Sequence, residues 1–199
     1  MFILGLTGSI GMGKSTTAKF FAEAGIPVHD ADAVVHRLYD GEAAAKIAEE
    51  FPGTVTLGKV DRERLGARVL GKPEAIKRLE DIVHPLVRAA ERAFLEKAER
   101  DGAPVVVLDV PLLFETKGDE RCDAVAVVSA PADVQRQRAF ERRGMSDDKL
   151  AAILQKQMPD EEKRRRADFV VDTSRGLDAA RDQVRDILKA IGKMPKRRR

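Results

Sequence analysis

Eight residues near the start of the chain, Gly8 to Ser15, have the types and spacing needed to hold a polyphosphate. They read Gly-Ser-Ile-Gly-Met-Gly-Lys-Ser, which fits G-x-x-x-x-G-K-[ST] at every fixed position. Glycines let backbone N–H groups approach phosphate oxygens without an intervening Cβ, and the start of a helix adds a positive field. An apolar run precedes the loop and a helical pattern follows it, as the motif requires. We expect a nucleoside triphosphate to bind here and to donate its γ-phosphoryl group.

The motif also predicts a role for each loop residue. Lys14 is expected to contact the β- and γ-phosphate oxygens, and the Ser15 hydroxyl is expected to bind Mg²⁺. The other predicted nucleotide contacts come from Gly8, Gly11, Met12, Gly13 and Thr16.

Carboxylates follow two of the predicted strands. Asp30 and Asp32 come at the end of Ile26–His29, and Asp109 lies within Val105–Val110. Phosphoryl transfer to a hydroxyl benefits from a carboxylate that orients the hydroxyl and accepts its proton. We expect one of Asp30 and Asp32 to do this, whereas a helix cap needs only one of them. Asp109 is expected on the metal side of the site, with a cap of the next turn as the alternative.

Arginines crowd the segment that follows Gln135. Arg138 and Arg142 are four residues apart, so they are expected on one face of a helix, where they cannot pair with each other. Such a pair could close over the transferring phosphates and neutralise their charge. A solvated charged face is the alternative, and the run Lys163–Arg166 is open to the same two interpretations.

The order of predicted elements favours an α/β fold, with a parallel five-stranded sheet flanked by helices. Short β-rich runs alternate with long helical patterns, and strands buried on both faces read as continuous apolar runs. The strands are expected at Phe2–Leu6, Ile26–His29, Val105–Val110, Ala124–Ser129 and Phe169–Val171.

Two excursions interrupt this single predicted domain, whose core comprises residues 1–31, 103–131 and 167–192. Residues 32–102 are far more than one crossover helix needs, and they predict a helical insertion above the carboxyl edge of the sheet. Its helices are expected at Ala43–Phe51, Asp61–Leu70 and Pro73–Arg100. Residues 132–166 form the arginine-rich excursion, and residues 193–199 form a basic tail.

The amino-acid composition indicates in which cellular compartment the protein works and which partners it lacks. The 36 basic residues nearly balance the 33 acidic ones, so no nucleic-acid partner is expected. Cys122 is the only cysteine, which excludes an intramolecular disulfide and fits a reducing compartment. No apolar run approaches the ~20 residues that span a bilayer. We therefore expect a soluble, cytoplasmic protein without a membrane partner, as a monomer or a weak homo-oligomer.

Together these residues resemble the dephospho-CoA kinase family. The phosphate loop alone is shared with thousands of proteins, but its combination with the other matching pieces is specific. Those pieces are Gly5–Thr16, Asp30-Ala31-Asp32, His84-Pro85 and Asp109–Glu115, followed in the family's order by Gln135, Arg138, Arg142, Gln157 and Ala167-Asp168.

The resemblance implies that ATP, with Mg²⁺, phosphorylates the ribose 3′-hydroxyl of dephospho-CoA, which yields CoA and ADP in the final step of coenzyme A biosynthesis. It implies Asp32 as the general base and Lys14 as the phosphate clamp. It makes residues 32–102 the acceptor-binding insertion and residues 132–166 a lid. The further site residues it implies are Arg138 and Arg142 in the lid, Asp172 near adenine, His84, Leu112 and Phe114 for the acceptor, and Ser15 with Asp109 for the metal.

From the residues alone, other functions stay open. Another small-molecule kinase would share the phosphate loop. The composition of the helical insertion does not reveal which acceptor it binds. A nucleotide-dependent switch is disfavoured because guanine-selecting and switch motifs are missing. An RNA-associated module is disfavoured because only a four-residue basic end, Lys196–Arg199, suggests it on a nearly neutral chain.

Overall fold

The computed structural model describes residues 1–196, so the last three residues of the predicted basic tail lie outside the described residues. The described chain divides into two compact units. Residues 30–97 form one of them, which we call the helical unit. Residues 1–29 and the chain from residue 98 onward form the other, which we call the sheet unit.

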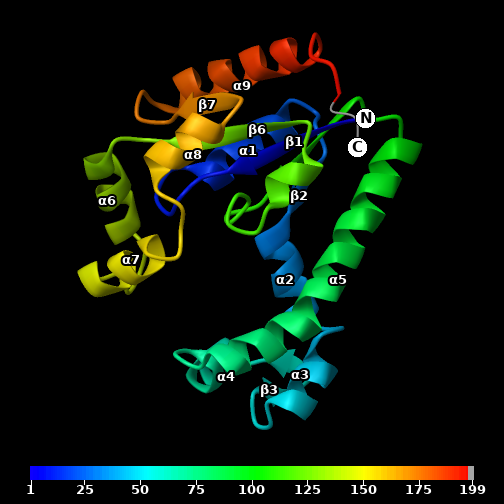
Figure 1. The fold of residues 1–199 in the computed structure, drawn as a ribbon, viewed down its shortest axis with the longest axis vertical. Coiled ribbons are helices and arrows are strands. Elements are labelled where there is room, and N and C mark those ends of the chain that lie inside the picture. The colour runs from blue at the N-terminus through cyan, green and yellow to red at the C-terminus, as the bar shows by residue number, and fades with distance from the viewer. Residues whose placement is uncertain (197–199) are drawn as a thin grey trace. The chain divides into compact units, whose positions relative to one another are not determined.

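The sheet unit contains a five-stranded sheet in the order β2-β5-β1-β6-β7 (Figure 1). β1 pairs in parallel with β5 and β6, and β6 pairs in parallel with β7. The predicted α/β fold with a parallel five-stranded sheet is confirmed. The strands are β1 Phe2–Thr7, β2 Val28–Asp30, β5 Val105–Asp109, β6 Ala124–Ser129 and β7 Phe169–Asp172.

Helices α1 (Lys14–Glu23) and α9 (Leu177–Ile191) share one apolar cluster with alternate side chains of β1, among them Leu4 and Leu6. On the opposite face of β1, Leu113 and Cys122 lie so close to Gly5 that a side chain would not fit there. A Cβ there would lie 2.7 Å from Leu113 Cδ2 and 2.9 Å from Cys122 Sγ. The strand is therefore covered on both faces, which is why it reads as a continuous apolar run.

The arginine-rich excursion forms helices α6 (Ala132–Phe140), α7 (Asp147–Leu154) and α8 (Asp160–Arg166). A short 3₁₀ helix, η1 (Gly118–Arg121), precedes β6. In the described part of the chain, no helix combines the length and apolar character that crossing a bilayer requires.

One basic residue of α8 belongs to the interior. Lys163 is completely buried, and its Nζ lies 3.0 Å from Glu115 Oε1 and 3.3 Å from the Pro111 carbonyl oxygen. Glu115 Oε1 also accepts a 2.6 Å hydrogen bond from the Met158 backbone N–H. Arg164–Arg166 are exposed, so the run that the sequence left open contains one structural cation and a solvated remainder.

The helical unit contains α2 (Ala31–Tyr39), α3 (Ala44–Glu50), α4 (Arg62–Val69) and most of α5 (Pro73–Arg100). The three predicted helices are confirmed as α3, α4 and α5. Helix α2 was not predicted from the sequence, and neither was the two-stranded antiparallel hairpin formed by β3 (Val55–Thr56) and β4 (Lys59–Val60). Pro85 lies inside α5. The buried core residues of this unit include Val34, Leu38, Ile47, Phe51 and Leu65.

The buried ion pair of α8 makes a testable contribution to stability. Lys163→Met leaves the Glu115 carboxylate without its cation, and we expect the free energy of unfolding to fall by about 3–5 kcal/mol. Arg164→Met, at the exposed neighbouring position, should change it by about 0.5 kcal/mol or less. Adding Glu115→Gln to Lys163→Met should restore part of the loss. Urea denaturation followed by circular dichroism measures all three variants; equal values for Lys163→Met and Arg164→Met would contradict the assignment.

Candidate active site

The phosphate loop connects β1 directly to α1. Gly11 and Gly13 have φ angles of +78° and +92°, a region that glycine adopts without steric cost. Gly13 is the N-cap of α1, and no side chain caps the N–H groups of the first turn. These donors are therefore available to an anion, with the helix dipole adding to the attraction.

Lys14, the first residue of α1, forms an ion pair with Asp109 at the end of β5. Its Nζ lies 2.6 Å from Asp109 Oδ1, and the two side chains are only 12% and 2% exposed. The register explains the contact, because Leu6 of β1 is paired with Asp109 of the neighbouring strand. The pairing of strands thus brings the predicted metal-side carboxylate to the phosphate loop.

The remaining residues of the phosphate loop differ in whether a side chain or only the backbone is accessible to a ligand. Ser15 and Thr16 are exposed on the first turn of α1, where their hydroxyls can meet a ligand. Met12 is buried, and its sulfur accepts a 3.1 Å hydrogen bond from the Ala130 N–H. Gly8 lies against β6, since a Cβ there would lie 2.7 Å from the Val128 carbonyl oxygen. Met12 and Gly8 can therefore contribute backbone groups but no side chain to a nucleotide site.

The two predicted lid arginines do not share a helix. Arg138 lies on α6, and its Nη1 and Nη2 donate to the hydroxyl and the carbonyl of Thr173 at 2.8 and 2.9 Å. Arg142 is exposed in the turn beyond α6, which ends at Phe140. The prediction that both lie on one helical face is wrong. Helix α6 ends at Phe140, and the turn that follows contains Gly144 with a φ angle of +75°, a conformation that occurs where a helix stops and not within one.

Asp172, predicted near adenine, ends β7 and is engaged within its own loop. Its Oδ1 accepts hydrogen bonds from the Ser174 hydroxyl at 2.7 Å and the Ser174 N–H at 2.9 Å. These bonds hold the pKa of Asp172 below its ordinary value. The carboxylate therefore shapes the loop that also contains Thr173.

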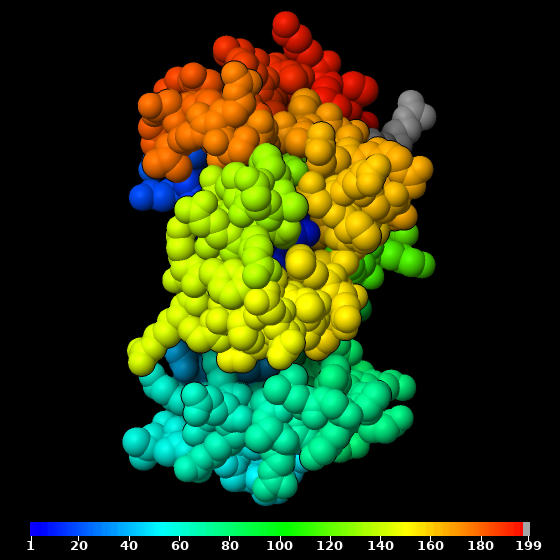
Figure 2. All heavy atoms as spheres, turned by 90° about the vertical axis from the view of Figure 1, so that its left-hand side faces the viewer, coloured from blue at the N-terminus to red at the C-terminus, as the bar shows by residue number. Residues whose placement is uncertain are grey.

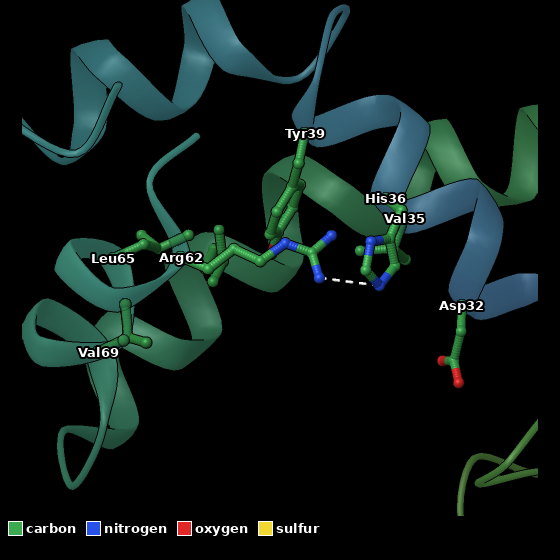
Figure 3. Close-up of a pocket in the computed structure, with 9 residues that line it drawn as sticks. Asp32, Val35, His36, Tyr39, Arg62, Leu65 and Val69 are labelled. Carbon is green, nitrogen blue, oxygen red and sulfur yellow. Dashed lines mark hydrogen bonds between the residues drawn. The ribbon is translucent and has the colours of Figure 1, made fainter. Parts of the chain in front are cut away.

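The helical unit contains a cavity of ≈ 390 Å³ (Figure 3). Asp32, His36 and Tyr39 come from one face of α2, at a spacing of four and three residues. The complete lining is Asp32, Val35, His36, Tyr39, Arg62, Leu65, Gly66, Val69 and Leu79.

Helix α4 contributes Arg62 to the polar side of the cavity. Its Nη1 lies 2.8 Å from His36 Nε2 (Figure 3). A guanidinium has only donors, so His36 Nε2 accepts this bond. The guanidinium carbon also lies 5.5 Å from the centre of the Tyr39 ring, within the range of a cation–π interaction. Burial raises the pKa of Tyr39, and the positive charge of Arg62 opposes that rise.

The two candidate carboxylates have different environments. Asp30 is the N-cap of α2, and its Oδ1 accepts a 2.9 Å hydrogen bond from the Ala33 N–H. Asp32 is exposed in the first turn of the helix and lines the cavity. The cap is thus provided by Asp30, and Asp32 is one of the residues that line the cavity, at its edge in Figure 3.

Several lining residues had no place in the sequence interpretation. His36 and Tyr39 went unrecognised because α2 was not predicted, although the Asp30 cap and the spacing of Asp32, His36 and Tyr39 were available signals. Arg62 begins the predicted helix α4, but no local pattern set it apart from the neighbouring Arg64. The predicted acceptor residues lie elsewhere. His84 is exposed on α5, while Leu112 and Phe114 belong to the sheet unit, where Phe114 is buried.

Comparison with known proteins identifies the family of the chain. A profile of the dephospho-CoA kinase family matches residues 2–179. A dephospho-CoA kinase from Rhodopseudomonas palustris is 62% identical over 198 residues, covering 100% of both chains. The crystal structure of a Thermus thermophilus protein has a TM-score of 0.84 at 36% identity, covering 96% of this chain and 97% of that one.

A second solved structure carries the family's name. The dephospho-CoA kinase from Campylobacter jejuni has a TM-score of 0.67 at 26% identity, covering 95% of this chain and 96% of that one. The family match covers most of the chain, and the likeness to the Rhodopseudomonas enzyme extends over its whole length. The chain therefore belongs to the dephospho-CoA kinase family and is an ATP-dependent kinase of the last step in coenzyme A biosynthesis.

Proposed function

We propose that the sheet unit binds MgATP at the phosphate loop and that the helical unit presents the ribose 3′-hydroxyl of dephospho-CoA to the γ-phosphoryl group. The main support for this proposal is the cavity of the helical unit. Asp32 lines this cavity, whereas the Asp30 side chain caps α2. An acceptor in this cavity would meet a carboxylate able to orient a hydroxyl.

Asp32 is the general base of the proposed reaction. It accepts the proton of the 3′-hydroxyl as the oxygen attacks the γ-phosphorus, and the bond from that phosphorus to the β,γ-bridging oxygen breaks. ADP carries the released electron pair on its β-phosphate. Lys14 leaves or shares Asp109 to contact the β- and γ-phosphate oxygens, which neutralises charge during the transfer. We assign Arg138 and Arg142 to the same side of the reaction, in the proposed lid of residues 132–166, with Asp172 near the adenine.

Mg²⁺ fits the residues available at the loop. It is bound in such sites by one or two protein oxygens together with phosphate oxygens and water. The Ser15 hydroxyl and the Asp109 carboxylate are oxygen donors of this kind. Among the described residues, no group of three or more His, Cys, Asp or Glu side chains could hold a metal ion alone, which agrees with binding together with ATP. When bound, the ion neutralises phosphate charge.

The acceptor cavity combines one cation with apolar walls. Arg62 supports binding of the diphosphate of dephospho-CoA, and Tyr39, Leu65 and Val69 offer surface to its uncharged parts. The insertion formed by residues 32–102 is therefore the proposed acceptor domain. His84, Leu112 and Phe114 remain proposed contacts for portions of the acceptor that extend beyond the cavity.

We also propose a cytoplasmic protein that works as a monomer or a weak homo-oligomer, without nucleic-acid or membrane partners. Cys122 is the only cysteine of the sequence, so no intramolecular disulfide can form, which supports a reducing compartment. The near balance of 36 basic and 33 acidic residues supports the lack of a nucleic-acid partner.

An acceptor screen tests the proposed reaction. ADP release from ATP, measured in a coupled assay, should rise sharply with dephospho-CoA and stay at background with nucleosides, nucleotides or shikimate. It should stop when EDTA removes Mg²⁺ and return when the metal is added back. ADP formation that is indifferent to the acceptor would sink the assignment.

The two aspartates provide a matched pair for the base. Asp32→Asn removes the proton acceptor, so we expect kcat to fall by about 10²–10⁴-fold while ATP binding stays intact. Asp30→Asn keeps an N-cap of equal quality and should leave kcat within about twofold. Steady-state kinetics and ATP titration measure both variants. The reverse order of the two effects would transfer the role to Asp30.

Arg62 tests the acceptor cavity. Arg62→Ala removes a charged donor, so the KM for dephospho-CoA should rise by about ten- to a hundredfold, with the KM for ATP unchanged. Arg64→Ala, two residues away on α4, removes an exposed ion pair with Asp61 and should leave both constants unchanged. An unaltered KM for dephospho-CoA in Arg62→Ala would place the diphosphate elsewhere.

A further inference from the structure

Two glutamines hold the same residue of the phosphate loop from opposite ends of its backbone. Gln157 Oε1 accepts a 3.1 Å hydrogen bond from the Ile10 N–H, and Gln135 Nε2 donates a 2.9 Å hydrogen bond to the Ile10 carbonyl oxygen. Gln135 comes from α6, and Gln157 from the connection between α7 and α8. Both backbone groups of Ile10 are therefore bonded to side chains far away in the sequence.

These bonds determine how the neighbouring peptide groups point. In a planar trans peptide, the carbonyl and the following N–H point in opposite directions. Fixing the Ile10 carbonyl towards Gln135 therefore turns the Gly11 N–H away from α6. The positive φ angles of Gly11 and Gly13 lie in a region that glycine enters and leaves at little cost. The loop thus needs an external restraint to keep one orientation.

Thr173 supplies a further restraint of the same kind. Its hydroxyl donates a 2.8 Å hydrogen bond to the Met12 carbonyl oxygen and accepts one from Arg138. Fixing the Met12 carbonyl in this way turns the Gly13 N–H away from Thr173. Figure 2 shows dark-blue atoms of the N-terminal part of the chain in the gap between the yellow-green α6 and the yellow-to-orange α7–α8 segment.

The packing around Gly11 supports a built contact rather than a chance approach. A Cβ on Gly11 would lie 2.5 Å from the Gln135 carbonyl oxygen, so the backbone of α6 lies directly against the loop. Both glutamines are partly buried. Gln137 on the same helix and Gln155 before the second glutamine are exposed. The chain therefore carries two glutamines at the loop and two matched ones in solvent.

We propose that Gln135 and Gln157 are positioning residues that hold the phosphate loop in its nucleotide-binding conformation, by fixing the Ile10 peptide groups so that the Gly11 N–H faces the phosphates. This proposal rests on the proposed use of the loop for ATP. It is independent of the acceptor, because the restraint acts on nucleotide binding alone.

Alanine variants test the restraint in the full-length protein. Binding of a non-hydrolysable ATP analogue, measured by calorimetry without acceptor, should weaken by about two- to tenfold for Gln135→Ala or Gln157→Ala. Gln137→Ala and Gln155→Ala should bind as the unmodified protein does. The KM for ATP should follow the affinity, and the KM for dephospho-CoA should stay constant. Amide hydrogen exchange should accelerate at residues 8–13 in the first two variants only.

A charge-matched pair separates positioning from general stability. Gln157→Glu keeps an oxygen that can accept from the Ile10 N–H, whereas Gln135→Glu places a carboxylate against the Ile10 carbonyl and loses the donor. Both add one negative charge. We expect Gln135→Glu to bind the analogue at least about threefold more weakly than Gln157→Glu, with the Ile10 amide still protected in the latter.

Three results would overturn the proposal. The first is analogue affinity in Gln135→Ala and Gln157→Ala equal to that of the solvent-exposed controls. The second is an equal loss in the two glutamate variants. The third is a parallel rise in both KM values with a lowered melting temperature, which would reduce the glutamines to structural residues. Failure of the acceptor screen with the analogue results intact would instead count against the acceptor alone.

Discussion

The parallel pairing of β1 with β5 is the constraint on which the nucleotide side of this molecule depends. It brings two segments that are distant in the sequence, the phosphate loop and Asp109, to the same edge of the sheet. The Lys14–Asp109 ion pair follows from that register. Since both partners are almost buried, neither charge can be left alone without a large desolvation cost. The pair therefore holds the Lys14 side chain at the loop in a defined position.

Polar side chains around the phosphate loop form hydrogen bonds with its backbone and so stabilise its conformation. The carbonyl groups of Ile10 and Met12 are bonded to Gln135 and Thr173, which leaves neighbouring N–H groups for an anion. The glycines permit this backbone shape, and the surrounding side chains select it. Arg138 belongs to this framework through Thr173. A phosphate site of this kind is thus a property of the whole sheet unit and not of eight residues.

The helical unit follows a different principle. Its cavity has no glycine loop and is lined mainly by residues of α2 and α4 (Figure 3). The helix cap distinguishes the surroundings of the two aspartates. A cap requires a side chain directly before the first helical turn, and Asp30 occupies that position. Asp32 then falls in the first turn, beside the residues that line the cavity. Two carboxylates two residues apart therefore have distinct surroundings.

The amino-acid sequence by itself determined the phosphate loop, the strands, the family resemblance and three helices of the insertion. Each of these depends on local spacing, or on apolar runs that burial on both faces requires. Tertiary structure alone decided that Lys163 is buried against Glu115 and that Arg138 is bonded to Thr173. It also decided that Arg62 meets His36 across the cavity. These outcomes depend on which side chains meet after the chain has folded, and residue spacing carries no information about partners that are distant in the sequence.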